Sequence, residues 1–232
     1  ARFLTADGLE QPGGAGSGRS KKDFEHSLPL DEALSHSLLA LEMNGEPLPA
    51  IHGGPLRLVT PGFYGTMHVK WLSALSLTSH ESAQESQLPR YRNPLHPLAP
   101  GSRFEPTLDN SRPNWWMNVK SIVFAPSPGA SLRAGSVTVR GVAFNDGAAR
   151  IDKVLLSWDR GETWSQADLE PPESRYAWTP WRQTRELPAG RYEVWSRAVD
   201  ANGRLQPLDG GVFWNPGGYE WNGVEKIAFA CL

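Results

Sequence analysis

The stretch SVTVRGVAF at residues 136–144 decides the fold class of the second half of the chain. Its apolar and polar side chains alternate, as they do along a strand with one buried face, and a turn signal, Asn-Asp-Gly, follows at residues 145–147. Comparable short runs recur between further Gly-containing turns: KSIVFAP (120–126), KVLLSWD (153–159), YEVWSRAV (192–199) and KIAFACL (226–232). This spacing predicts an antiparallel β-sandwich of about seven strands.

The composition agrees with a folded, turn-rich β protein. Ten Trp, 23 Gly and 20 Pro occur in 232 residues, and 39% of the residues are apolar against 21% charged. The formal net charge of -2 argues against a general nucleic-acid binder, and no apolar run is long enough to predict a membrane span. Cys231 is the only Cys, which excludes an intrachain disulfide and a site built from several Cys residues.

Before the sandwich, the chain has a mixed α+β pattern. A Gly/Ser-rich polar stretch at residues 11–22 is typical of a surface loop. From about Asp31 to Leu41, apolar residues at helical spacing follow an acidic first turn and predict a helix. The runs LRLVT (56–60) and MHVKWLSALSL (67–77) predict two strands around a Pro-Gly turn.

Residues 81–114 show little periodicity and are rich in Pro, Ser, Asn and Arg. We expect a long irregular segment there, and such segments often carry function. Because the character of the sequence changes at about residue 119, we divide the chain into residues 1–118 and 119–232.

The first part contains a candidate anion site. His52 and Arg57 flank Gly53-Gly54-Pro55, and His68 and Lys70 stand two apart, so both would point to one face of the expected strand. Cationic side chains beside Gly-rich turns suit an anion such as phosphate. The alternative is that the glycines only form turns and that the basic side chains are solvated.

Tyr91 lies between Arg90 and Arg92 in the irregular segment. A phenol and guanidinium groups can donate together to an oxyanion, so this triplet is a second candidate site. The alternative is a surface turn with a packed Tyr ring.

The Trp residues of the second part allow two readings. An aromatic sandwich can bind carbohydrate, but such rings more often form the core and subunit interfaces. No G-x-S-x-G, Walker or H-E-x-x-H motif is present, and the six His residues are scattered, so neither a hydrolase nor a zinc site is expected.

A longer set of motifs resembles one known family. EMNGEPLP (42–49), HGGPLR (52–57) and HVKWL (68–72) follow one another in the order found in the sulfite oxidase family. The segments SWDRGETW (157–164), TPWRQT (179–184), RAVDANGRLQP (197–207) and WNPGGYEWN (214–222) are similar to the family's C-terminal dimerisation domain. The resemblance implies a partial α+β molybdenum-cofactor domain over residues 1–118 and an all-β immunoglobulin-like dimerisation domain over residues 119–232.

The resemblance also implies roles for single residues. Six positions match family residues that contact the molybdopterin: His52, Arg57, His68, Val69, Lys70 and Glu10. At Glu10 the family has an Asp. Tyr91 matches a family Tyr of the substrate pocket and is the expected catalytic residue. Gly217 stands where vertebrate enzymes place an Arg that reaches this pocket.

The activity implied is a molybdenum–molybdopterin oxidoreductase that oxidises sulfite to sulfate and passes electrons to a haem or cytochrome c. We further expect a homodimer formed through the sandwich and a periplasmic location. Alternatives are a sulfane dehydrogenase, another molybdenum oxidoreductase of the family, a non-catalytic dimerising scaffold or fragment, and a carbohydrate-binding sandwich.

The family's molybdenum-ligating Cys lies upstream of these motifs, and Cys231 is in no matching motif. We therefore expect this segment alone to be inactive. Half of an α+β domain would leave core surface exposed, so we expect the missing N-terminal half of the same domain to pack against it.

Overall fold

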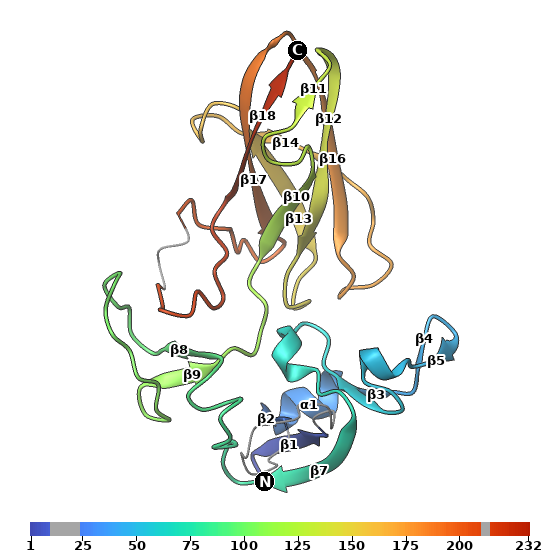
Figure 1. Cartoon of the computed structure of the whole chain (residues 1–232), viewed down its shortest axis with the longest axis vertical. Coiled ribbons are helices and arrows are strands. Elements are labelled where there is room, and N and C mark those ends of the chain that lie inside the picture. Colours follow the sequence, from blue (N-terminus) through green and yellow to red (C-terminus); the bar gives the residue numbers. More distant parts are fainter. Residues whose placement is uncertain (10–23, 210–213) are drawn as a thin grey trace, which may run out of the picture. The chain divides into compact units, whose positions relative to one another are not determined.

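The computed structural model describes residues 1–9, 24–209 and 214–232. The chain forms two compact units, which Figure 1 shows in sequence colours. The first comprises Ala1–Trp116 and Asn215–Tyr219, and the second comprises Met117–Trp214 and Glu220–Leu232. Each unit has its own hydrophobic core.

The first unit is built on a three-stranded antiparallel sheet of order β2-β1-β7. Its strands are β1 (Phe3–Gly8), β2 (Phe24–Pro29) and β7 (Leu72–Thr78). The strand β2 leads directly into helix α1 (Leu30–His36), which carries two acidic residues in its first turn, where the helix dipole favours them. The buried core of this unit consists of Ala6, Leu28, Ala33, Leu58, Phe63, Met67 and Val69.

The helix is shorter than the sequence predicts. It ends at His36, and Ser37 is extended, after which β3 (Leu38–Ala40) pairs with β6 (Arg57–Val59). The apolar residues at helical spacing are Ala33, Leu34, Leu38 and Leu41; only Ala33 of these is buried, whereas Leu34 is 75% exposed. Strand pairing after Ser37 therefore outweighs the local helical periodicity.

The second predicted strand also begins later than expected. Residues 65–67 form a 3-10 turn, η2 (Gly65–Met67), and β7 starts only at Leu72. Between them, Trp71 has a positive φ of 48° and donates its backbone N–H to Gly53. His68 and Lys70 are therefore positioned by a loop and not by a strand.

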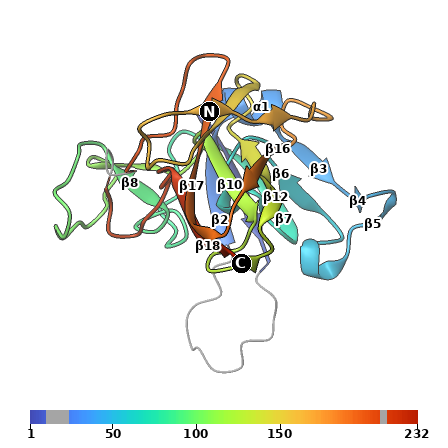
Figure 2. The same ribbon diagram turned by 90° about the horizontal axis from the view of Figure 1, so that it is seen from above.

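Short elements complete the first unit. The two-residue strands β4 (Glu42–Met43) and β5 (Glu46–Pro47) form a hairpin around Asn44-Gly45, and both turn residues have positive φ. This hairpin extends away from the central sheet in both Figures 1 and 2. A 3-10 turn, η1 (Ala50–His52), follows it, and β8 (Arg92–Pro94) pairs with β9 (Ser111–Pro113) inside the irregular segment.

The second unit is a sandwich of two sheets, as the sequence predicts. One sheet has the order β10-β12-β16-β15, and the other has the order β11-β18-β17-β13-β14. The strands are β10 (Lys120–Ala125), β11 (Ser131–Leu132), β12 (Gly135–Phe144), β13 (Ile151–Ser157), β14 (Ser165–Gln166), β15 (Asp168–Leu169), β16 (Thr179–Leu187), β17 (Gly190–Asp200) and β18 (Glu225–Cys231). All pairs are antiparallel except β11 with β18.

Strand β16 is the long strand that the sequence pattern did not indicate. It pairs with β12 along its whole length, from Gly135↔Leu187 to Ala143↔Thr179. Trp181 on this strand is 1% exposed and joins the core, together with Val139, Val154, Leu156, Val194 and Phe229. Among the residues described, no helix has the length and apolar character needed to cross a bilayer.

Candidate functional site

A pocket in the first unit has a volume of about 440 Å³. Ligand pockets in proteins have volumes of about 300–1,000 Å³, so it has room for a cofactor. It is formed by the end of β1, the start of β2, β6, η2 and the loop before β7. Its lining residues are Leu9, Phe24, Arg57, Gly65, His68, Lys70 and Trp71.

Three side chains of the pocket are anchored on one turn, η1. The Arg57 guanidinium donates from Nη1 to the carbonyl of His52 at 3.0 Å, and Lys70 Nζ donates to that of Ile51 at 2.8 Å. The indole Nε1 of Trp71 donates to Ala50 at 2.8 Å. The consecutive carbonyl groups of this turn therefore hold the side chains of Arg57 and Lys70 in place.

Glycines allow the turn and the cations to approach so closely. Gly53 has a φ of 100°, and a Cβ there would lie 2.7 Å from Cβ of Lys70. On the other side, a Cβ at Gly8 would lie 2.3 Å from the carbonyl oxygen of Lys70 and 2.7 Å from Cγ1 of Val69. Larger residues at either glycine would displace the backbone that carries Lys70.

The pocket is electrostatically suited to an anion. Arg57 and Lys70 line it, and no carboxylate does so among the residues that the structure describes. The Nε of Arg57 is buried and has no hydrogen-bond partner among the described residues, and burial lowers the pKa of this guanidinium. A buried charge-assisted donor without a partner is costly, so an acceptor from a ligand would stabilise it.

His68 contributes a neutral imidazole. Burial lowers its pKa below the ordinary 6.5; the positive charge of Arg57 acts in the same direction, and the hydrogen bond to the Phe63 carbonyl opposes both. That bond joins Nε2 of His68 to the Phe63 oxygen at 3.2 Å. At neutral pH the ring therefore adds hydrogen-bonding capacity to the pocket without adding charge.

The remaining residues of the expected pterin site lie elsewhere. The side chain of His52 is exposed and does not line the pocket, although its carbonyl holds Arg57. The side chain of Val69 is fully buried in the core, which leaves only its backbone for a ligand. Glu10, like the expected loop at residues 11–22, lies outside the described residues.

Tyr91 does not line the pocket but is connected to it by a row of rings. Phe24, which lines the pocket, lies 4.5 Å from the ring centroid of His26, and His26 lies 6.2 Å from that of Tyr91. The Tyr91 ring is also 5.5 Å from the ring of Tyr219. Only Tyr91 of these four was singled out by sequence, because an aromatic ring or a His in a strand is usually ordinary core.

The two Arg residues beside Tyr91 are both engaged with carboxylates. Arg90 is exposed and pairs with Glu85 at 2.7 Å, and Arg92 is fully buried against Glu81 at 2.8 Å. These ion pairs favour the alternative of a turn with a packed Tyr ring over an oxyanion site shared by the whole triplet.

A buried polar network instead ties this segment to the sheet. Arg92 donates to both carboxylate oxygens of Glu81, and to the hydroxyl and the carbonyl of Ser111. Gln87 donates to Glu81 at 2.8 Å and accepts from the backbone N–H of Ser27 on β2. The network fixes the chain on both sides of Tyr91 to the strand that carries His26.

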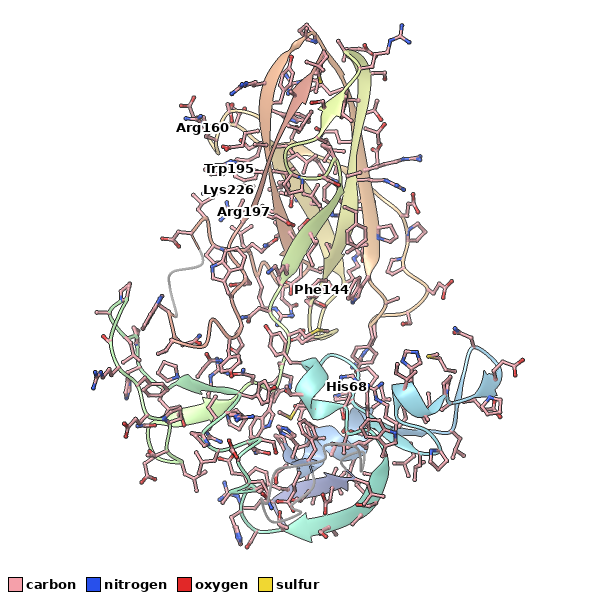
Figure 3. All side chains as sticks on the ribbon, in the orientation of Figure 1. His68, Phe144, Arg160, Trp195, Arg197 and Lys226 are labelled. Atoms are coloured by element: carbon pink, nitrogen blue, oxygen red, sulfur yellow. The ribbon has the colours of Figure 1, made fainter. Side chains whose placement is uncertain are left out.

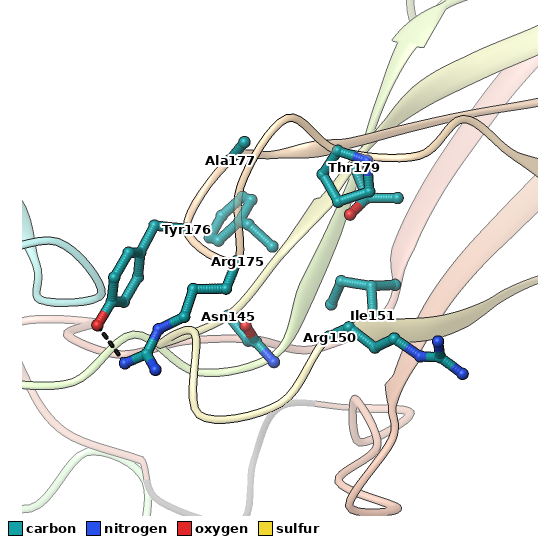
Figure 4. Close-up of a pocket in the computed structure, with 9 residues that line it drawn as sticks. Asn145, Arg150, Ile151, Arg175, Tyr176, Ala177 and Thr179 are labelled. Atoms are coloured by element: carbon teal, nitrogen blue, oxygen red, sulfur yellow. Dashed lines mark hydrogen bonds between the residues drawn. The ribbon is translucent and has the colours of Figure 1, made fainter.

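The second unit contains a much smaller hollow. The hollow shown in Figure 4, between Asn145, Ile151 and Tyr176, has a volume of about 20 Å³, which is room for about one water molecule. Figure 3 shows Arg160, Trp195, Arg197 and Lys226 along one side of this unit. Lys226 lies 4.0 Å above the Trp195 ring, and Arg197 lies 5.6 Å from the Trp164 ring.

These cations cover one face of each of those rings, so the rings are not bare platforms for sugar stacking. No group of three or more His, Cys, Asp or Glu that could hold a metal ion occurs within residues 1–9, 24–209 and 214–232. Cys231 is buried in the sandwich core.

Comparisons with known proteins identify two family domains in the chain. Residues 1–86 match the oxidoreductase molybdopterin binding domain, and residues 111–227 match the Mo-co oxidoreductase dimerisation domain. Mitochondrial sulfite oxidase of Mus musculus is 33% identical over 217 residues, which is 87% of this chain and 38% of that protein. Sulfite oxidase of Gallus gallus is 34% identical over 225 residues, 90% of this chain and 45% of that protein.

Among solved structures, the sulfane dehydrogenase SoxCD from Paracoccus pantotrophus is similar, with a TM-score of 0.79 and 26% sequence identity. That similarity covers 98% of this chain and 54% of the other. The chain thus spans less than half the length of the two sulfite oxidases and about half of the solved chain.

Proposed function

This chain belongs to the sulfite oxidase family of molybdopterin oxidoreductases, and from that premise we propose that its pocket binds a molybdenum–molybdopterin cofactor. The observation that carries the proposal is that Arg57 and Lys70 both line a pocket whose described lining residues include no carboxylate, and that one Arg57 donor has no protein partner in the described part of the chain. A molybdopterin is anionic through its phosphate and planar in its ring system, and the pocket has cations together with the rings of Phe24 and Trp71.

The roles of the residues follow from their chemistry. Arg57 and Lys70 would bind the anionic part of the cofactor, and neutral His68 would hydrogen-bond a polar edge. The chemistry that such a group supplies, when bound, is two-electron oxidation coupled to oxygen-atom transfer. Tyr91 would hydrogen-bond the substrate oxyanion and orient it.

The substrate that we propose is sulfite. Sulfite and water give sulfate, two protons and two electrons, and the electrons would pass to a haem or cytochrome c acceptor. The similarity to sulfite oxidases supports this choice. The metal ligand would come from polypeptide beyond these 232 residues, because the only Cys is buried in the core of the second unit.

A sulfane sulfur compound is the second candidate substrate. It is favoured by the similarity to the sulfane dehydrogenase over nearly the whole chain and by Gly217, which supplies no cation where vertebrate sulfite oxidases place an Arg. Steady-state oxidation of sulfite and of thiosulfate by the same loaded protein separates the two, because only one should be turned over with a high kcat/KM.

The assembly and the location belong to the same proposal. A homodimer through residues 119–232 is supported by the match to a dimerisation domain. Light scattering on the purified protein tests it, and a monomer at micromolar concentration would exclude a stable dimer. We also propose a periplasmic location, which fractionation of the source cells would test.

The cofactor proposal is tested on the full-length protein by substituting Arg57→Met. Loss of a charge-assisted hydrogen bond should reduce the amount of pterin retained after gel filtration by about tenfold or more. The matched control is Arg90→Met, because Arg90 is an Arg of the same unit that is exposed and paired with Glu85 outside the pocket. Equal loading of both variants would reject the assignment of Arg57.

Molybdenum per chain, measured by elemental mass spectrometry, distinguishes an enzyme from a scaffold. About one metal per chain in the full-length protein supports the oxidoreductase. Absence of molybdenum from protein expressed with the cofactor available would support the non-catalytic dimerising scaffold instead.

A further inference from the structure

We propose that Tyr219 is a positioning residue for Tyr91. The glycine at position 217 leaves the space that the Tyr219 ring needs in order to contact the Tyr91 ring. The inference rests on the proposed function in one respect only, which is that Tyr91 touches the substrate. The packing of the two rings is a property of the fold.

Tyr91 needs support from its surroundings. Its φ is 52°, a left-handed conformation that residues with a side chain rarely adopt unless neighbouring structure holds them there. No described residue hydrogen-bonds its phenol hydroxyl, since its one hydrogen bond is from the Asn114 N–H to its backbone carbonyl. The direction of the phenol is therefore set by packing of the ring and not by a bond to the hydroxyl.

Two rings supply that packing. His26 lies 6.2 Å from the Tyr91 ring centroid at an interplanar angle of 51°, and Tyr219 lies 5.5 Å from it at 50°. His26 is fixed in the middle of β2, where it pairs with Ala6. Tyr219 comes from the far end of the sequence, in the short segment Asn215–Tyr219 that packs with the first unit.

That segment is built to present Tyr219 in one orientation. The buried side chain of Asn215 accepts the backbone N–H of Tyr219 at 2.9 Å and donates to its carbonyl at 2.8 Å. The N–H of Gly218 donates to the Asn215 carbonyl, and Gly218 has a φ of 64°. A loop closed on itself in this way leaves the Tyr219 ring little freedom.

Gly217 is the position on which this arrangement depends. A Cβ at residue 217 would lie 2.6 Å from Cε2 and 2.9 Å from Cδ2 of Tyr219, which is closer than real contacts allow. Any side chain at 217 must therefore push the Tyr219 ring away. The absence of a side chain at residue 217 thus permits the contact between the rings of Tyr219 and Tyr91.

The experiment uses the full-length, cofactor-loaded protein labelled with 3-fluorotyrosine. The fluorine resonance of Tyr91 is assigned by its loss in Tyr91→Phe. We expect this resonance to move in Tyr219→Ala, which removes the ring, and in Gly217→Ala, which displaces it. It should keep its position in Tyr219→Phe, which retains the ring. Tyr219→Phe is thereby the matched control in the same loop, because any side chain at the neighbouring Gly218, with a φ of 64°, would strain the backbone.

Turnover gives the second readout. With unchanged molybdenum and pterin loading, kcat/KM should fall about tenfold or more in Tyr219→Ala and Gly217→Ala, because small misplacements of a catalytic group are costly. Tyr219→Phe should remain within about twofold of the parent, since the ring and not the hydroxyl is proposed to act.

Three outcomes would each contradict one part of the proposal. An unmoved Tyr91 resonance in Tyr219→Ala rejects the positioning role whatever the turnover is. A loss in Tyr219→Phe as large as in Tyr219→Ala also rejects it, because the hydroxyl would then act directly. If Tyr91→Phe turns over substrate like the parent, the proposed role of Tyr91 fails, while a moved resonance still supports the packing.

Discussion

His26 illustrates how a single buried residue links the fold to pH. It is fully buried in β2, and neither ring nitrogen has a hydrogen-bond partner among the described residues. Burial lowers its pKa from 6.5 to about 4. The unfolded chain therefore binds a proton between about pH 6.5 and 4 that the folded protein does not bind, so acid favours unfolding in this window. The difference between the two pKa values corresponds to about 3 kcal/mol of folding stability, which is present at neutral pH and is lost as the pH falls towards 4.

We expect His26→Leu to remove this pH dependence. The free energy of unfolding of the variant, from urea titrations at pH 7, 5.5 and 4.5, should fall less steeply with acid than that of the parent. The exposed His96 offers the matched control, because His96→Leu removes one imidazole without removing a buried one. Equal flattening in both variants would contradict a special role for the buried ring.

Single residues also show how far sequence reasoning reaches at the site. The structure brings Arg57, His68 and Lys70 into one pocket, as their basic character beside glycines indicates. It does not place the side chains of His52 and Val69 there, because a motif cannot tell whether a residue contributes its side chain or its backbone. The partnership of Tyr91 with Tyr219 joins positions 128 residues apart by number, and no local pattern could indicate it.

At the scale of elements, the irregular segment 81–114 depends on one buried ion pair. The side chain of Arg92 is 0% exposed and binds Glu81, which is 15% exposed. Glu81→Gln keeps the shape but leaves the Arg92 charge buried without a counter-charge, which should cost about 3–5 kcal/mol. Glu85→Gln is the control, because its pair with Arg90 is 60% exposed on both sides and should contribute about 0–1 kcal/mol.

Urea denaturation of the two variants at neutral pH measures this difference. If both substitutions cost the same small amount, the buried pair does not anchor the segment. A large cost for Glu81→Gln would mean that the buried pair stabilises the segment that carries Tyr91.

The elements themselves were predictable where one face is buried and the pattern is strong. The runs at 136–144 and 192–199 become β12 and β17, whose inward residues fill the sandwich core. The helix expected to Leu41 fails because strand β3 pairs with β6 immediately after Ser37, and this long-range pairing leaves no trace in the helical spacing. Strand β16 was missed because polar residues interrupt its alternation, although Trp181 is deeply buried.

At the scale of the whole molecule, the first unit exposes a group of apolar side chains that lie close together in the sequence. They lie in α1, β3, β4 and η1 and at the residue between β3 and β4: Leu34, Leu38, Leu39, Leu41, Met43 and Ile51. The relatives are more than twice as long as the part matched here, so further polypeptide of the same domain is the occupant that we propose. An exposed apolar surface of this kind otherwise favours association.

We therefore expect a chain limited to residues 1–232 to bind the dye ANS and to self-associate, whereas the full-length protein does neither to the same extent. In the short chain, Leu34→Ser combined with Ile51→Ser should reduce dye binding, because these two side chains are 75% and 73% exposed. Leu232→Ser is the control, since Leu232 is 77% exposed but lies at the end of the second unit, outside the surface concerned. Fluorescence and light scattering at equal concentration measure the outcome. Equal dye binding by the short and full-length proteins would mean that the rest of the polypeptide covers a different face.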